Sequence, residues 1–185
     1  MILFRCFPWD RTVDPATRGG PLWFPRMLQG EGRHDAPTLY GCLYVSAEPV
    51  STVVEQLARF TGTTLSASDL VRRGRPLALG AVILADEGVL VDLDEPAILE
   101  AEDLRPSIVA SGERPRTQAY AAELYERHPE AAGLRWWSTF ESLWANVTLF
   151  DRAATGLTVE DVQPLALDDD VVGDAARFLG LSVAA

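Results

Sequence analysis

Three residues whose side chains could bind or cleave a ligand lie at equal intervals in the first third of the chain. They are Arg33, Tyr44 and Glu55, and each lies eleven positions after the one before it. A guanidinium binds phosphate or ribose oxygens, an aromatic ring stacks on a flat heterocycle, and a carboxylate stabilises positive charge that develops on a sugar. A dinucleotide that is cleaved at a glycosidic bond would use all three. The spacing by itself favours a simpler interpretation, in which the arginine is exposed, the tyrosine lies half-buried on a strand and the glutamate is solvated on a helix.

The segment that carries these residues predicts a loop, a strand and a helix in succession. Residues 8–37 are rich in Pro, Gly and Trp and predict a long irregular loop, and loops of that length usually serve a binding site. Residues 38–47 alternate as a strand does, with Tyr44 on the face opposite to the most aliphatic one. A helix is predicted from Pro49 to about residue 62, and its apolar stripe leaves Glu55 on the opposite face.

The rest of the chain predicts strands in pairs and a few helices. Segments 77–85 and 88–93 flank Asp86, Glu87 and Gly88 and predict a β-hairpin. The other expected elements are strands at 2–7, 134–138 and 145–150 and helices at 94–104, 116–128 and 170–180. Because the strands cluster instead of alternating with helices, we expect a single α+β domain over residues 1–185, with a mixed, mostly antiparallel sheet flanked by helices.

Composition and charge limit the function classes. All 16 basic residues are arginine, against 27 acidic residues, and the net charge is -11. Direct binding of nucleic acid is not expected, because it needs a basic face, whereas one or two arginines in a cleft can still bind a small anion. No run of about 18 apolar residues and no leader-like segment occurs, which favours a cytoplasmic protein over a membrane or secreted one. Cys6 and Cys42 are expected to be buried thiols.

A longer pattern joins these residues to later ones. The GR pair at 32–33 is followed by GCLYVSAEPVSTVVE, which contains Tyr44 and Glu55, and a later segment, GLRWWS, ends at Ser138. The chain also begins with a strand-like FRCF. This order resembles the RES domain family, which is named for an arginine, a glutamate and a serine. The resemblance covers residues 2 to about 150.

The resemblance implies a bacterial toxin of a type II toxin–antitoxin system, with a fold similar to ADP-ribosyltransferases. Such toxins degrade NAD+ at the nicotinamide–ribose bond, as a glycohydrolase or a phosphorylase, without a metal or cofactor, and an Xre-like antitoxin blocks the site. On this basis Arg33 anchors the dinucleotide, Tyr44 packs against nicotinamide and Glu55 stabilises the ribosyl cation. Ser138 orients Glu55 or a ribose hydroxyl. Water or inorganic phosphate as the acceptor, and self-association of the chain, are left open.

Two positions depart from the family pattern. His34 stands where the family often has an aromatic residue after the GR pair, and Phe140 stands where it often has an arginine. The phenylalanine puts a second anion contact at that point in doubt. Arg5, on an apolar strand, is either a paired, semi-buried cation or a second phosphate contact.

Other chemistries fit less well. Ser138 has no GxSxG elbow, which disfavours a hydrolase with His128 as the base. His34 and His128 are expected to be surface or capping residues and not metal ligands. The acidic run at 168–170 precedes a predicted helix and is expected to be solvated.

Three classes of function therefore remain, with the NAD+-degrading enzyme first. The second is an ADP-ribosyltransferase that modifies a protein or small molecule, and the third is a catalytically silent module that binds an antitoxin. Release of free nicotinamide, labelling of a target, and binding without consumption of NAD+ distinguish them.

Overall fold

The computed structural model describes residues 1–85 and 89–184 and divides into two compact units. The first unit consists of Met1, Phe24–Tyr44 and Leu84–Leu157, and the second of Ile2–Trp23, Val45–Ile83 and Thr158–Ala185. The boundary falls within strand β2 (Cys42–Ser46). The single domain expected over residues 1–185 stays a prediction.

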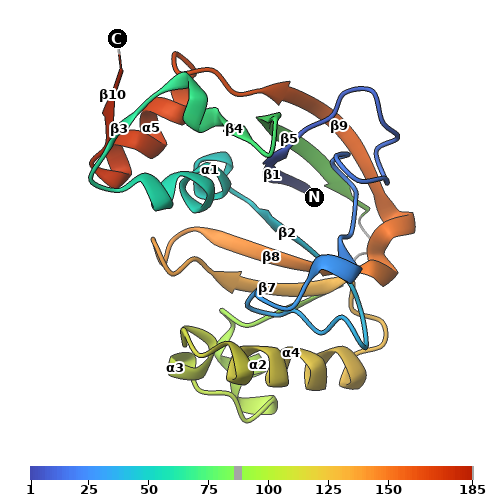
Figure 1. Ribbon diagram of the computed structural model, residues 1–185. Coiled ribbons are helices and arrows are strands. Elements are labelled where there is room, and N and C mark those ends of the chain that lie inside the picture. The colour runs from blue at the N-terminus through green and yellow to red at the C-terminus, as the bar shows by residue number, and fades with distance from the viewer. Residues whose placement is uncertain (86–88, 185) are drawn as a thin grey trace. The chain divides into compact units, whose positions relative to one another are not determined.

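The first unit combines a small sheet with three helices. Its strands and helices are β6 (Leu90–Asp92), β7 (Gly133–Trp137), β8 (Ala145–Phe150), α2 (Pro96–Ala101), α3 (Pro106–Val109) and α4 (Arg114–Arg127), with short 3-10 turns η1 (Arg26–Leu28) and η4 (Asp151–Gly156). The strands follow the order β8-β7-β6, with β7 antiparallel to β8 and parallel to β6. The three helices gather on one side of these strands (Figure 1).

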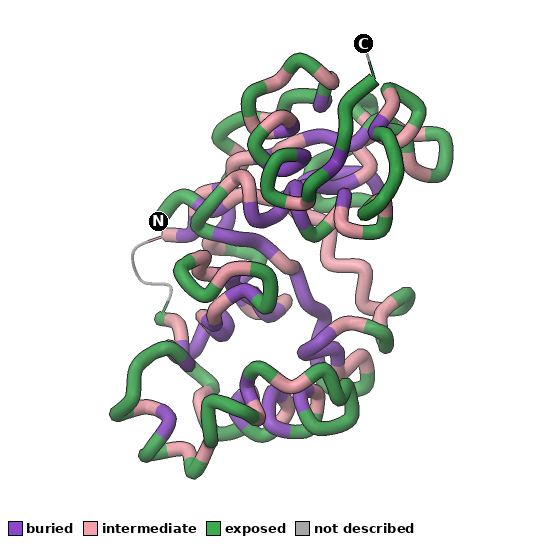
Figure 2. The backbone as a smooth tube through the Cα atoms, turned by 90° about the vertical axis from the view of Figure 1, so that its left-hand side faces the viewer, coloured by how far each residue is buried: buried purple, intermediate pink, exposed green. Residues whose placement is uncertain are grey.

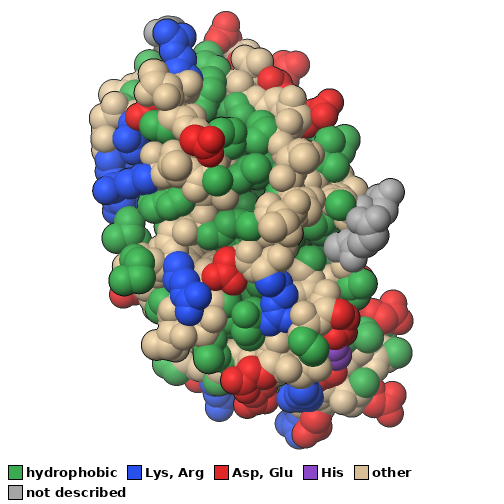
Figure 3. All heavy atoms as spheres, turned by 90° about the vertical axis from the view of Figure 1, so that its right-hand side faces the viewer, with side chains coloured by type: hydrophobic (Ala, Val, Ile, Leu, Met, Phe, Trp, Pro, Cys, Tyr) green, Lys and Arg blue, Asp and Glu red, His purple; other side chains and the backbone are tan. Residues whose placement is uncertain are grey.

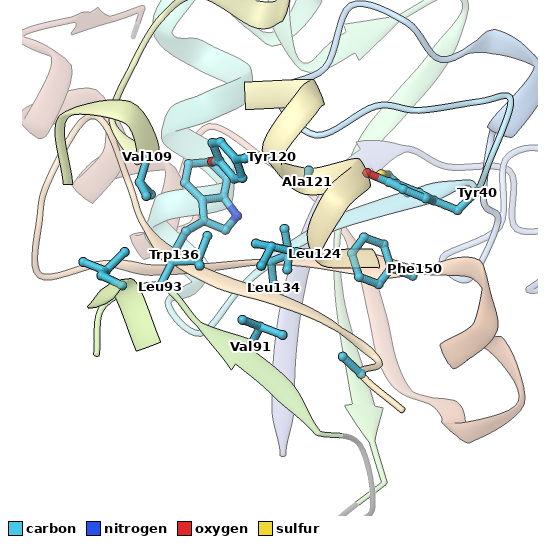
Figure 4. Packing of buried hydrophobic residues seen from close by; sticks show 13 residues of the cluster. Tyr40, Val91, Leu93, Val109, Tyr120, Ala121, Leu124, Leu134, Trp136 and Phe150 are labelled. Atoms are coloured by element: carbon cyan, nitrogen blue, oxygen red, sulfur yellow. The ribbon is translucent and has the colours of Figure 1, made fainter. Parts of the chain in front are cut away.

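Helix α4 forms because its apolar residues recur at helical spacing behind a proline in the first turn. Tyr120, Ala121 and Leu124 are buried, as the sequence predicted. They pack into a cluster with residues of β7 and β8, among them Trp136 and Phe150, and Figure 4 shows the side chains of this cluster. This cluster is the core of the first unit, and it forms the wall against which the Arg33 loop lies.

The second unit is built on a longer antiparallel sheet. Its elements are β1 (Ile2–Pro8), α1 (Pro49–Leu57), η2 (Ala58–Phe60), β3 (Thr64–Leu65), η3 (Ala67–Leu70), β4 (Val71–Arg72), β5 (Arg75–Leu84), β9 (Leu157–Pro164), α5 (Asp170–Leu179) and β10 (Ser182–Val183). β1 pairs antiparallel with β5 and with β2, β4 and β9 also pair with β5, and β3 pairs parallel with β10. α1 packs on β1 and on α5.

Helix α1 carries one of the predicted site residues. It begins at Pro49, as predicted, and buries Val53, Val54 and Leu57 completely, so that Glu55 is left on the exposed face. The α-helix ends at Leu57 and continues only as a 3-10 turn, which is shorter than the predicted helix. Figure 2 marks buried and exposed stretches along the chain in purple and green.

The mixed, mostly antiparallel α+β fold is confirmed, but one predicted pairing is wrong. The strands β5 and β6 exist, yet β5 pairs with β1 and β6 pairs in parallel with β7, so the two do not form the predicted hairpin. The expected turn, Asp86–Gly88, lies outside the described residues. Strand β9 was not predicted, because half of its residues are polar and most of them are exposed. Among the helices described, none is long and apolar enough to cross a bilayer.

The surface mixes charge types. On the face drawn in Figure 3, arginine and acidic side chains form separate small groups among apolar side chains. The most exposed large apolar residues are Met27, at 92% exposure, and Leu143, at 87%, both in the first unit. Single exposed apolar residues of this kind are normal on a protein surface.

Candidate functional site

The loop that carries Arg33 is held by one carboxylate. Asp35 Oδ2 accepts hydrogen bonds from the backbone N–H groups of Gly30 (2.8 Å) and Gly32 (2.7 Å). The other oxygen, Oδ1, accepts from the hydroxyl of Tyr44 at 2.7 Å, and that hydroxyl accepts from the backbone N–H of His34 at 2.9 Å. The strand tyrosine is therefore tied directly to the loop.

Gly32 is required by this arrangement. A Cβ at residue 32 would lie 2.5 Å from both Asp35 Oδ1 and the Tyr44 hydroxyl oxygen, which no side chain tolerates. Burial raises the pKa of Tyr44 well above its ordinary value, with further contributions from Cys42 and Asp35, so the phenol stays protonated and donates to the carboxylate. The side chains of Asp35 and Tyr44 therefore explain why residue 32 is a glycine.

The Arg33 side chain is buried, with 8% exposure, which contradicts the interpretation of an exposed arginine. Its Nη1 donates to the carbonyl oxygens of Val109 (2.9 Å) and Ser111 (2.7 Å), at the end of α3. The guanidinium carbon lies 5.0 Å from the ring centroid of Trp136, in cation–π geometry. The hydroxyl of Thr117 donates to the Arg33 carbonyl at 2.6 Å, which fixes the backbone as well.

His34 was expected at the surface or as a cap, and this expectation is wrong. The imidazole is fully buried, and its nitrogens lie 2.8 Å from Thr148 Oγ1 and 2.7 Å from the Tyr120 hydroxyl oxygen. Burial, followed by the positive charges of Arg33 and Arg114, lowers the pKa of His34 well below its usual range. The only sequence signal for this residue was its place directly after the GR pair.

Ser138 follows β7 at the start of the loop to β8. Its side chain is nearly inaccessible, at 2% exposure, and its Oγ accepts from the backbone N–H of Phe140 at 3.1 Å. The backbone N–H of Ser138 donates to the Trp144 carbonyl at 2.8 Å. Two residues earlier in the chain, Trp136 contacts Arg33 and is buried.

The remaining two predicted residues, Glu55 and Arg5, belong to the second unit. Glu55 is exposed on α1. Arg5 Nη1 donates to the carbonyl oxygen of Pro21 at 2.7 Å, and the guanidinium lies 4.9 Å from the Phe7 ring centroid. Burial lowers the pKa of Arg5 to about 10, which leaves it charged at neutral pH. These contacts fit a semi-buried cation held by backbone carbonyls, and the alternative of a phosphate contact stays a prediction.

The structure thus brings together Arg33 and Tyr44 in the first unit, through His34 and Asp35, and places Ser138 in the same unit. Sequence reasoning missed Asp35, although its partners Gly30, Gly32 and Tyr44 lie within nine positions of it. It also missed the side-chain partners of His34, which lie 86 and 114 positions away in the chain.

The second histidine and the two cysteines have contacts or burial that fit a structural role. His128 is the C-terminal cap residue of α4, and its Nε2 lies 2.8 Å from a carboxylate oxygen of Glu102, as expected for a capping residue. Cys6 and Cys42 are buried free thiols, as predicted. In residues 1–85 and 89–184, no three His, Cys, Asp or Glu side chains form a group able to hold a metal ion.

Comparison with solved structures finds a similar fold in a chain of the M. tuberculosis MbcT–MbcA toxin–antitoxin complex. The TM-score is 0.57 and the identity is 16%, and the match covers 97% of this chain and 87% of that chain. No curated protein matches the sequence. Comparison with protein families matches residues 3–170 to the RES domain, which extends beyond the range of the sequence resemblance and includes residues of both units. The chain therefore belongs to the RES domain family.

Proposed function

We propose that this protein is the toxin of a type II toxin–antitoxin system and that it cleaves NAD+ at the nicotinamide–ribose bond. Membership of the RES family supports the proposal, as does the similar fold of a chain from a toxin–antitoxin complex. The observation that carries it is the buried guanidinium of Arg33, fixed by two carbonyls and the Trp136 ring. A guanidinium held in a fixed position matches the oxygens of a phosphate or a ribose, so Arg33 supports the binding of an anionic ligand such as a dinucleotide.

In this proposal Arg33 anchors the dinucleotide and Tyr44 packs against the nicotinamide. The bond between C1′ of the ribose and the nicotinamide nitrogen breaks, and the electron pair leaves with nicotinamide. The carboxylate of Glu55 stabilises the positive charge that this step creates on the ribose. Water then adds to C1′ and releases a proton, or inorganic phosphate adds in its place. In this proposal Ser138 orients a ribose hydroxyl.

An antitoxin partner fits the surface of the first unit. The loop from Ser138 to Trp144 contains Phe140, which is 40% exposed, and the more exposed Leu143. An antitoxin that covers these apolar side chains would lie directly over the segment that carries Ser138 and would limit access to it.

The test is incubation of the purified protein with NAD+, with and without inorganic phosphate, followed by proton NMR of the products. Free nicotinamide should appear together with ADP-ribose if water is the acceptor, or with its 1″-phosphate if phosphate is. Intact NAD+ after incubation under both conditions would overturn the proposal. Attachment of ADP-ribose to a protein or small molecule, without release of free ADP-ribose, would indicate a transferase instead.

A further inference from the structure

We propose that an arginine-rich hairpin of the second unit, together with the hollow beside it, binds an acidic segment of a partner protein that carries one large apolar side chain. The arginine cluster consists of Arg59, Arg72, Arg73 and Arg75. All four residues, and all those that line the hollow, belong to the second unit. Nothing in this binding depends on the cleavage of NAD+.

The hairpin of β4 and β5 carries three of these arginines at its tip. Arg72 and Arg75 lie directly opposite each other across the strand pair, and like charges in such positions destabilise a sheet. The two turn residues between them, Arg73 and Gly74, both have positive φ, at 53° and 75°, as a type I′ turn requires. Glycine and asparagine favour that conformation, whereas an arginine is strained in it.

The fourth arginine joins the tip from the end of α1. Gln56 Oε1 accepts from Arg72 Nη1 at 2.7 Å and from Arg59 Nη2 at 3.2 Å. Two guanidinium groups therefore meet at one neutral amide oxygen. Burial, followed by the positive charges of Arg59 and Arg73, lowers the pKa of Arg72. In residues 1–85 and 89–184, no carboxylate forms an ion pair with Arg59, Arg72 or Arg73.

The features of this tip work against folding, and local strain of this kind is typical of binding surfaces. The opposed pair of Arg72 and Arg75, the positive φ of Arg73 and the shared oxygen of Gln56 each bring cations together or strain the backbone. A ligand that supplies negative charge would relieve the repulsion. The arginine cluster is therefore explained by an anion that comes from outside the unit.

Arg75 indicates which anion this surface accepts. Its Nη2 lies 3.1 Å from Asp10 Oδ2, so a carboxylate of the same unit already pairs with one arginine of the cluster. Guanidinium groups match carboxylates well, because their N–H donors can meet both oxygens at once. A nucleic acid fits less well, since it needs an extended basic face and the chain has a net charge of -11.

A hollow of about 550 Å³ borders the same hairpin. Arg75 and Pro76 of the hairpin line it, together with Trp9 and with Pro164 at the end of β9. The backbone N–H of Trp9 donates to the Pro76 carbonyl at 2.9 Å, which ties two parts of the wall to each other. The hollow is large enough for one aromatic side chain, and tryptophan and arginine are among the residues most enriched where binding energy concentrates at protein interfaces.

Two synthetic peptides serve as probes, acetylated Glu-Glu-Phe-Glu-Glu and Glu-Glu-Ser-Glu-Glu, titrated into the whole protein at low ionic strength by calorimetry and 1H–15N NMR. The Phe peptide should bind about tenfold more tightly than the Ser peptide, because its ring is buried in the hollow. The backbone signals of Arg73 and Gly74 and the indole signal of Trp9 should shift. Equal affinity of the two peptides, absence of binding, or shifts confined to other residues would overturn the proposal.

A double variant tests the charges. Arg72→Gln combined with Arg73→Gln should lower the affinity for the Phe peptide by about tenfold. Arg18→Gln combined with Arg177→Gln is the matched control, because these are exposed arginines of the same unit and the change in net charge is equal. The control should keep nearly the wild-type affinity, and an equal loss in both double variants would show that only net charge matters and would overturn the proposal.

Arg73→Asn separates binding from folding. Asparagine tolerates positive φ, so the urea midpoint should not fall, while the affinity for the Phe peptide should fall about two- to fivefold. A lower urea midpoint with unchanged affinity would show that Arg73 serves the fold and would overturn the proposal. A short DNA duplex that binds more tightly than either peptide, and loses affinity in the Arg72 and Arg73 double variant, would assign the surface to nucleic acid instead.

Discussion

Replacement of Gly32 by alanine tests the geometry that places Arg33. The added Cβ would lie 2.5 Å from Asp35 Oδ1, 2.5 Å from the Tyr44 hydroxyl oxygen and 2.7 Å from Asp35 Cγ. None of these atoms can retreat freely, because the carboxylate holds two backbone N–H groups and the phenol. Overpacking of this kind costs about 1–3 kcal/mol, and loss of one hydrogen bond to a charged group about 1.5–3 kcal/mol.

Gly32→Ala should therefore lower the free energy of unfolding by about 2–4 kcal/mol, after allowing for the smaller entropy of the unfolded chain with alanine. Urea denaturation at neutral pH measures this value. Gly112→Ala is the matched control in the same unit, because a Cβ there meets nothing within 4 Å, and it should change stability very little. A Gly32→Ala protein as stable as the control would refute the steric account of the GR pair.

Three further predictions concern buried groups of the fold. Burial raises the pKa of Cys6 to about 12 and that of Cys42 well above its usual value, so iodoacetamide at pH 8 should label neither thiol until urea is added, and labelling of the native protein would contradict their burial. Thr52→Val removes the acceptor of the buried Cys6 N–H, now at 2.7 Å, and should lower the free energy of unfolding by about 1–3 kcal/mol, whereas the exposed Thr158→Val should not. Because the pKa of His34 is lowered in the fold, its contribution to stability is present above the unfolded pKa of about 6.5 and is lost as the pH falls below it, by about 1.4 kcal/mol per pH unit. Urea midpoints between pH 7 and 5 should show this slope in the wild type, and an equal slope in His34→Gln would rule it out.

The elements that the sequence predicted well are those whose information is local. β1, α4 and α5 each carry a periodic apolar pattern with a proline or glycine at an end, and the structure places them close to the predicted ranges. The predicted pairing of β5 with β6 is wrong, because the true pairing depends on residues that are far apart in the chain. A parallel partner such as β7 is more than 40 residues away from β6 in the chain, and no local pattern indicates it.

For the candidate site, too, the sequence indicated some features and not others. Residue types and order, together with the family resemblance, indicated Arg33, Tyr44, Glu55 and Ser138. The burial of Arg33 and the network of His34 could not be predicted, because they depend on contacts across long separations: His34 and Thr148 are 114 positions apart. A polar residue in a loop carries no local signal that it will be enclosed by a core of aromatic side chains.

The central claim is that Glu55 drives cleavage of NAD+, and nicotinamide release by Glu55→Gln tests it most directly. The residue is exposed on α1, so the change should leave the fold intact, as circular dichroism and urea midpoints can verify. Glu48→Gln, an exposed carboxylate at the start of the same helix, is the matched control. The account predicts that Glu55→Gln lowers kcat by about 10²–10³-fold while Glu48→Gln keeps the wild-type rate. Wild-type turnover in a folded Glu55→Gln protein would contradict it.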